Sequence, residues 1–302
     1  MKVMICGGTG FIGTRLTAHL LDHGWQVTAV ARSGRGPYPE SDRYQYLSAD
    51  TTKPGHWQEA VGDADAVVNL TGATIFRIWT EKYKRVLRDS RILTTRHVVE
   101  AFPEGGGRVL FNASGAGYYG DQGDRLLDES APSGDDFMAR LAADWETEAF
   151  KATAKGVRVA VGRFGVVLDR DGGAIEKMLP AFRMFVGGPL GDGKQWFPWI
   201  HLQDHMEAVR FVLENESAEG AFNFTAEQPV RNEDLVQTLA RHLHRPAVLS
   251  APSLMMKLVL GDLAQAFLAS QRTVPKRLLE SGFNFRYPDI ESAMAEVFRP
   301  RE

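Results

Sequence analysis

Three glycines near the start of the chain have the spacing of a phosphate-binding turn. Gly7, Gly10 and Gly13 lie between a short apolar segment and a stretch in which apolar residues recur every three or four positions. This order predicts a buried strand, a tight turn and a helix. Glycines there let the backbone approach a pyrophosphate, which the helix N-terminus attracts. The turn therefore predicts dinucleotide binding, with a purely structural turn as the alternative.

The end of the next predicted strand, residues 26–31, indicates which dinucleotide is bound. Arg32 stands at this end, about 20 positions beyond the turn, and Arg35 follows. An acidic residue here would bind the ribose hydroxyls of NAD, whereas a guanidinium binds a 2′-phosphate through paired, charge-assisted hydrogen bonds. Arg32 therefore favours NADP(H), and a solvated basic loop is the alternative.

A second polar group follows the predicted strand 108–113. Ser114, Tyr118 and Tyr119 stand in the glycine-containing loop 114–120. Because ligands of doubly wound sheets bind beyond the carboxyl ends of the strands, this loop is the candidate catalytic site. Ser114 would hydrogen-bond a substrate carbonyl, and one of the tyrosines would supply a phenol. Ordinary packing of the tyrosine pair is the alternative.

The pattern of the chain places these residues in an α/β fold. Alternating strands and helices indicate a Rossmann-like, doubly wound parallel sheet. The predicted strands are residues 1–5, 26–31, 44–49, 65–70, 108–113, 157–167 and 221–226, and the predicted helices are residues 11–23, 80–102, 136–155, 204–213 and 232–242.

Other residues at the strand ends are further candidates for cofactor contacts. Asp50 follows the strand 44–49 and is placed near the adenine, while Gly72 would let the backbone pass over the cofactor. Arg91 lies in the helix 80–102 and either reaches back to the phosphates or is solvated. The candidate cofactor contacts are Gly7, Gly10, Phe11, Ile12, Gly13, Arg32, Asp50, Leu70, Thr71, Gly72, Arg91 and Arg163.

The strand-helix alternation stops after the sixth strand. A glycine-dense loop at 187–193 and an aromatic segment at 196–201 are typical of a lobe or lid over a substrate. Residues 1–168 are assigned to the Rossmann core, with 201–228 returning to it. Residues 169–200 and 229–302 are assigned to a substrate lobe and C-terminal domain.

Composition excludes several classes of protein. The 302 residues are 44% hydrophobic and 24% charged, with a net charge of −3. Nothing here indicates nucleic-acid binding, and no apolar run is long enough for a membrane span. The single cysteine, Cys6, favours a reduced, cytoplasmic compartment. His242 and His244 lack a partnered ligand spacing, so no metal site is expected.

These motifs together resemble the extended short-chain dehydrogenase/reductases. The turn 7–13, the loop 114–120, the segment 163–168 and the stretch 187–201 are similar to its atypical branch of NAD(P)-dependent, sugar-nucleotide epimerase-like proteins with a small C-terminal domain. The tail, with Arg272 and Tyr287, is similar to that domain. The resemblance implies an NADP(H)-binding core and, by residue match, cofactor contacts that include Leu70, Thr71 and Arg163.

One departure from this resemblance concerns the chemistry. Typical extended members use a tyrosine whose pKa is lowered toward neutrality by a lysine four positions on. None of the seven tyrosines has that lysine, and the expected place reads Phe137-Met138-Ala139-Arg140-Leu141. His201 could act near neutral pH, but a structural hydrogen bond in the lobe is the preferred interpretation.

Two functions therefore stay open. The first is an NADP(H)-dependent epimerase, dehydratase or reductase that acts on an unidentified carbonyl or sugar-nucleotide compound through Ser114 and Tyr118 or Tyr119. The second is a catalytically weak or inactive NADP(H)-binding protein with a regulatory or interaction role. The enzyme is preferred, and a homodimer is a possible assembly.

Overall fold

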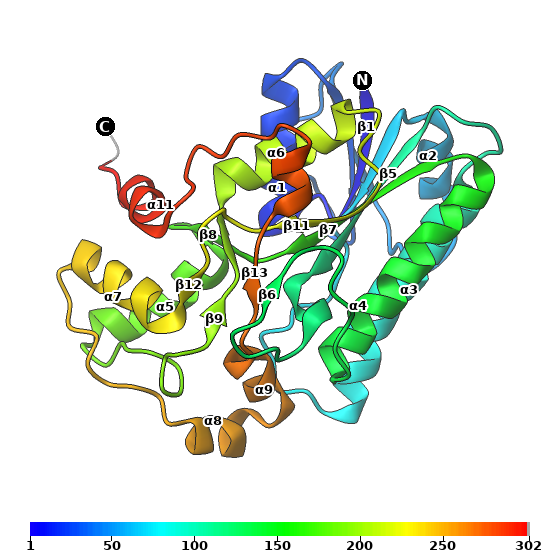
Figure 1. Ribbon diagram of the computed structural model, residues 1–302. Coiled ribbons are helices and arrows are strands. Elements are labelled where there is room, and N and C mark those ends of the chain that lie inside the picture. The colour runs from blue at the N-terminus through cyan, green and yellow to red at the C-terminus, as the bar shows by residue number, and fades with distance from the viewer. Residues whose placement is uncertain (301–302) are drawn as a thin grey trace.

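A seven-stranded parallel sheet forms the centre of the molecule (Figure 1). The computed structural model describes residues 1–300. The strand order is β11-β7-β5-β4-β1-β2-β3, so the chain runs outward from β1 and then crosses to the other side of the sheet. This order and the parallel pairing confirm the predicted Rossmann-like fold. The strands are β1 (Lys2–Cys6), β2 (Gln26–Ala31), β3 (Tyr44–Ser48), β4 (Ala66–Asn69), β5 (Val109–Gly115), β7 (Arg158–Phe164) and β11 (Gly220–Phe224).

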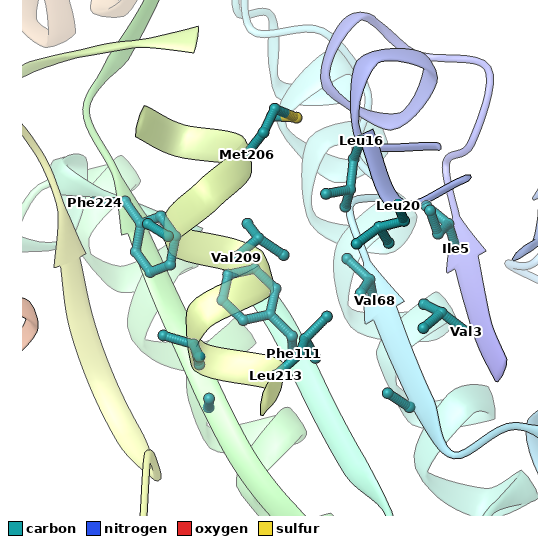
Figure 2. Close-up of a cluster of buried hydrophobic side chains, with 14 of the residues drawn as sticks. Val3, Ile5, Leu16, Leu20, Val68, Phe111, Met206, Val209, Leu213 and Phe224 are labelled. Atoms are coloured by element: carbon teal, nitrogen blue, oxygen red, sulfur yellow. The ribbon is translucent and has the colours of Figure 1, made fainter. Parts of the chain in front are cut away.

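Helices cover both faces of the sheet, because successive residues of each strand point to opposite sides. Val3 and Ile5 face one apolar core, and Met4 and Cys6 face the other. Figure 2 shows the first core, where side chains of α1, β1 and α6 meet. The first face carries α1 (Phe11–Asp22) and α6 (Leu202–Glu214), and the second carries α2 (Glu59–Asp63), α3 (Glu81–Ala101) and α4 (Phe137–Phe150).

The predicted strand 157–167 is divided in two. β7 stays in the sheet, whereas β8 (Val166–Asp169) leaves it and pairs with β10 (Trp199–His201). Gly165 stands at the break, where a Cβ would lie 2.9 Å from the backbone of Pro198. This close approach of a distant segment could not be read from the local sequence.

A third apolar core lies beyond β8. Trp199 is buried there with side chains of α5, α7 and α11. The remaining elements are α5 (Gly173–Arg183), β6 (Leu126–Leu127), β9 (Trp196–Phe197), β12 (Val230–Arg231), α7 (Asn232–Leu243), α8 (Ser253–Leu260), α9 (Asp262–Leu268), β13 (Arg272–Thr273), α10 (Lys276–Glu280), α11 (Ile290–Val297) and the 3-10 turns η1 (His56–Gln58), η2 (Ala116–Tyr119) and η3 (Lys151–Lys155). The predicted division into core and lobe stays a prediction.

Helix α6 begins earlier than expected. The sequence predicted a helix over residues 204–213, but the helix starts at Leu202, and Nδ1 of His201 accepts the hydrogen bond from the Gln203 backbone at 3.2 Å. The buried Asp204 carboxylate instead accepts the backbone N–H groups of Arg286 and Tyr287, both at 2.9 Å. Asp204 therefore attaches the C-terminal segment to the sheet layer.

Within residues 1–300, every helix is too short or too polar to cross a bilayer.

Candidate functional site

The glycine turn joins β1 to α1 in the expected way. Gly7 has a φ of +84°, a left-handed conformation that favours glycine. A Cβ on Gly13 would lie 2.3 Å from the Gly7 carbonyl oxygen, so α1 approaches the turn this closely only with glycine there. Gly10 is the N-cap and provides no side-chain cap, and the first turn, which contains Phe11 and Ile12, has no acidic residue. The N-terminus of α1 is thus available to an anion.

A cleft of about 330 Å³ opens beside this turn. Because β1 to β4 are parallel, the cleft lies along the carboxyl ends of neighbouring strands, where such folds bind ligands. The predicted cofactor contacts that line it are Gly7, Gly10, Arg32, Asp50, Leu70, Thr71 and Gly72.

Arg32 and Asp50 place opposite charges at one end of this cleft. Hydrogen bonds from the Thr52 side chain (2.7 Å) and backbone (3.2 Å) hold the pKa of Asp50 below its usual value, and the charge of Arg32 lowers it further. No carboxylate forms a salt bridge with Arg32 in the described part of the chain. Its guanidinium is therefore available to an anion from outside the protein.

Arg91 lies directly behind the cleft. It extends from α3 to Gly72, where a Cβ would lie 2.8 Å from its Cζ atom, and it donates to the carbonyl oxygens of Leu87 and Ala73 at 3.0 and 3.3 Å. Burial lowers the pKa of Arg91 to about 10. Among residues 1–300 no carboxylate pairs with it. Arg91 is partly buried, and a cation removed from water without a counter-ion is costly unless an anion completes the site.

The cleft has the properties that a nicotinamide dinucleotide requires. The Thr71 hydroxyl is buried beside it without a hydrogen-bond partner in the described structure. Together with the uncapped α1 and the two arginines, this hydroxyl gives a set of donors for phosphate and ribose oxygens. The residues present thus fit such a cofactor.

Ser114 lies at the same edge of the sheet, at the end of β5. It is 5% exposed, and its hydroxyl donates to Oε1 of Glu146 on α4 at 2.7 Å. Arg163 holds the same carboxylate through two hydrogen bonds of 2.9 Å, and both side chains are almost fully buried. Burial opposes the charged guanidinium, but its bonds to Glu146 raise the pKa of Arg163 above its ordinary value. A direct cofactor contact for Arg163 stays a prediction, since its guanidinium already binds Glu146.

The two candidate tyrosines lie in different environments. Tyr119 is fully buried, and its hydroxyl donates to Asn223 at 2.7 Å and accepts from Arg163 at 3.0 Å. Burial raises the pKa of Tyr119 to about 12. Tyr118 is only partly buried, and its ring lies 3.5 Å from the guanidinium carbon of Arg163. Of the pair, Tyr118 is the one whose hydroxyl forms no hydrogen bond within the described residues.

The family resemblance predicts a tyrosine and a lysine at the start of helix α4. Helix α4 contains neither residue type. Met138 and Glu146 lie two helical turns apart on α4. Met138 packs against the loop at Gly117, where a Cβ added to the glycine would lie 3.4 Å from the Met138 Cβ atom. In place of an ammonium beside a phenol, α4 therefore provides a carboxylate beside a serine.

Glu146 was not among the residues predicted from the sequence, although one signal was present. Ala139, Ala142, Glu146 and Ala149 recur at spacings of three and four, so an acidic residue occupies a buried helical face. Only the fold shows that Ser114 and Arg163 lie opposite it.

Two other polar residues have structural roles. His201 caps α6, and burial lowers its pKa to about 4, which agrees with the preferred structural interpretation. Glu129 is partly buried and accepts the backbone N–H groups of Asn223 and Arg277. Burial raises the pKa of Glu129 above its usual value.

Comparisons with known proteins show the family to which the chain is related. The sequence matches the NAD dependent epimerase/dehydratase family over residues 3–224 and a domain of unknown function, DUF1731, over residues 251–297. The epimerase family protein SDR39U1 homolog of Arabidopsis thaliana, described as chloroplastic, is 38% identical over 99% of this chain and 87% of its own length.

Two solved structures are similar over 99% of the chain. Human epimerase family protein SDR39U1, crystallised with NADPH, has a TM-score of 0.86 and 33% identity over 99% of its length. A nucleoside-diphosphate sugar epimerase from Corynebacterium glutamicum has a TM-score of 0.77 and 32% identity, and the match covers 58% of that longer protein. The chain described here belongs to the NAD dependent epimerase/dehydratase family, within the extended short-chain dehydrogenase/reductases.

Proposed function

We propose that this protein is an NADP(H)-dependent oxidoreductase or epimerase that acts on a carbonyl or sugar-nucleotide compound. The observation that carries the proposal is Arg32, a cation without a salt-bridge partner among the described residues, in the cleft beside the glycine turn. The NADPH bound by the human relative supports the choice of cofactor. The name of the Corynebacterium glutamicum relative supports the substrate class.

Each polar group of the cleft has a place in this proposal. The N-terminus of α1 and Arg91 bind the pyrophosphate, and Arg32 binds the 2′-phosphate. Asp50, kept ionised by Thr52, accepts hydrogen bonds on the adenosine side. When bound, the cofactor supplies a carbon that accepts or releases hydride.

The bond from Ser114 to Glu146 determines what Ser114 can do for a substrate. A hydroxyl has one proton, and Ser114 donates it to Glu146, so its free lone pairs accept a hydrogen bond. Ser114 therefore binds a substrate hydroxyl more readily than a substrate carbonyl. As that hydroxyl loses its proton, Ser114 can take it up while Glu146 receives the serine proton. Tyr118, not the buried Tyr119, is the phenol available for the opposite transfer.

A second function is favoured by α4, which contains no tyrosine and no lysine. Without this pair, the protein would bind NADP(H) but turn it over slowly, and it would act through its surface in regulation or interaction. For either function, we propose that the protein forms a homodimer.

One experiment distinguishes the two functions. The protein is incubated with labelled NADPH and a panel of carbonyl compounds and nucleotide sugars. The enzyme should transfer label to at least one compound, and S114A and Y118F should reduce transfer while NADPH affinity stays unchanged. Tight NADPH binding without transfer to any compound would favour the second function. Failure to bind NADPH would contradict both.

A further inference from the structure

Two histidines and a glutamate converge on the face of the sheet that carries α1 and α6. His19 and His23 lie one turn apart at the C-terminal end of α1, and Glu207 lies on α6. These two helices pack on the same apolar core (Figure 2). Since α1 begins at the glycine turn, the cluster lies at the end of the helix away from the cofactor cleft.

The three ligand atoms are close together. Oε1 of Glu207 lies 3.5 Å from Nε2 of His19 and 3.9 Å from Nε2 of His23. All three atoms lie within 4.8 Å of one another. In a tetrahedral zinc site with bonds of about 2.0–2.1 Å, neighbouring ligand atoms are roughly 3.4 Å apart. The two separations from Glu207 are near this value, and the distance between the two ring nitrogens is bounded by 4.8 Å.

Hydrogen bonding leaves the relevant nitrogen atoms available. Nδ1 of His23 lies 2.8 Å from the carbonyl oxygen of His19. A carbonyl oxygen only accepts, so Nδ1 carries the proton, and in the neutral ring Nε2 keeps its lone pair. This arrangement is typical of metal-binding histidines. Nε2 of His19 is buried and has no hydrogen-bond partner in the described structure.

The third ligand is held in place by a neighbour on α6. Arg210 donates to Oε2 of Glu207 at 2.8 and 3.0 Å, so that Oε1 is the oxygen turned toward the histidines. Arg210 also pairs with Glu214 at 2.7 Å, which offsets part of its positive charge. Two ring nitrogens and a carboxylate oxygen therefore lie close enough together to hold one cation.

We propose that His19, His23 and Glu207 form a binding site for a divalent transition-metal ion of the zinc class, with a fourth position open to solvent at the exposed His23. Two imidazole nitrogens favour such ions over Mg²⁺ and Ca²⁺, which prefer oxygen ligands. The bound ion would link the end of α1 to α6. The sequence alone predicts no metal site, because Glu207 is far from the histidines along the chain.

The proposal is tested by calorimetric titration with zinc chloride. The full chain is used, prepared without an affinity tag. One ion should bind per chain, magnesium chloride should not compete, and zinc should raise the melting temperature. H23A should weaken binding at least about tenfold and remove the thermal shift. H56A is the matched control, because His56 is fully exposed and outside the cluster, and it should bind as the wild type does.

Several outcomes would overturn this assignment. These are the absence of saturable one-to-one binding, equal affinities of the wild type and H23A, and equal losses in H23A and H56A. Unchanged NADPH affinity in both variants checks that they are folded, and it separates this test from that of the proposed function. The buried Cys6 does not compete for the ion in the folded protein.

Discussion

At the residue scale, Arg32 should determine the choice between the two nicotinamide dinucleotides. R32A removes the cation assigned to the 2′-phosphate, so NADPH binding should weaken by about 2 kcal/mol, the usual contribution of hydrogen bonds to a charged group. NADH has no such phosphate, and its affinity should change little. Fluorescence titration with both cofactors measures the effect. R35A, in the same loop but outside the cleft, is the control, and equal losses of both cofactors in R32A would contradict the assignment.

Replacing Tyr119 by Phe should lower stability, whereas replacing Tyr118 by Phe should change stability little. Y119F leaves the Asn223 carbonyl without its donor in the core, so the free energy of unfolding should fall by roughly 1–3 kcal/mol. Y118F removes a hydroxyl with no hydrogen bond in the described structure and should change stability by less than about 0.5 kcal/mol. Denaturant unfolding measures both. A larger loss in Y118F would show that the structural roles are reversed.

Individual residues could be predicted where their role is local. Arg32 follows a strand that follows a glycine turn, and this order along the chain places it in the cleft. Glu146 could not be assigned in the same way, because its partners Ser114 and Arg163 lie on two strands distant in sequence. The alanines around Glu146 in the sequence indicate that an acidic residue lies on a buried helical face, but they do not indicate its partners.

At the scale of elements, the glycine turn allows a sharp steric test. A methyl group at residue 13 would lie 2.3 Å from the Gly7 carbonyl oxygen, so G13A should move α1 away from the turn. We expect a loss of about 1–3 kcal/mol in stability, as for other overpacked sites, with weaker NADPH binding. G62A is the control, since a Cβ on Gly62 meets nothing within 4 Å. Thermal unfolding and cofactor titration measure both variants, and wild-type behaviour of G13A would disprove this account.

Elements with a regular apolar pattern were predictable, and interruptions were not. The central strands β1, β4, β5 and β7 follow from runs of apolar residues, since parallel strands covered on both faces are continuously apolar. Two short helices, α8 and α9, lie in the C-terminal region and are separated by Gly261 at a φ of +57°, and α8 exposes Leu254 and Leu258. The helix α5 was not anticipated.

At the scale of the whole molecule, buried histidines should make stability depend on pH. His205 on α6 is completely buried against Phe164 and Phe224, and neither ring nitrogen has a hydrogen-bond partner in the described structure. Burial lowers the pKa of His205 to about 3, whereas an unfolded histidine has a pKa near 6.5. The unfolded chain therefore binds a proton below pH 6.5 that the folded chain excludes until about pH 3, so His205 lowers stability as the pH falls through this range.

H205L should remove this contribution. At pH 5 the proton bound by the unfolded state costs the wild type about 2 kcal/mol that the variant does not lose. Burial raises the pKa values of the partly buried Glu129 and the buried Asp204, so these groups act in the opposite direction, but they are present in both proteins and cancel in the difference. The difference in unfolding free energy between H205L and wild type, measured in urea, should shift in favour of H205L by about 2 kcal/mol between pH 7.5 and pH 5. If the two stability curves ran parallel over this range, His205 would not be the neutral, unpartnered histidine that its surroundings require.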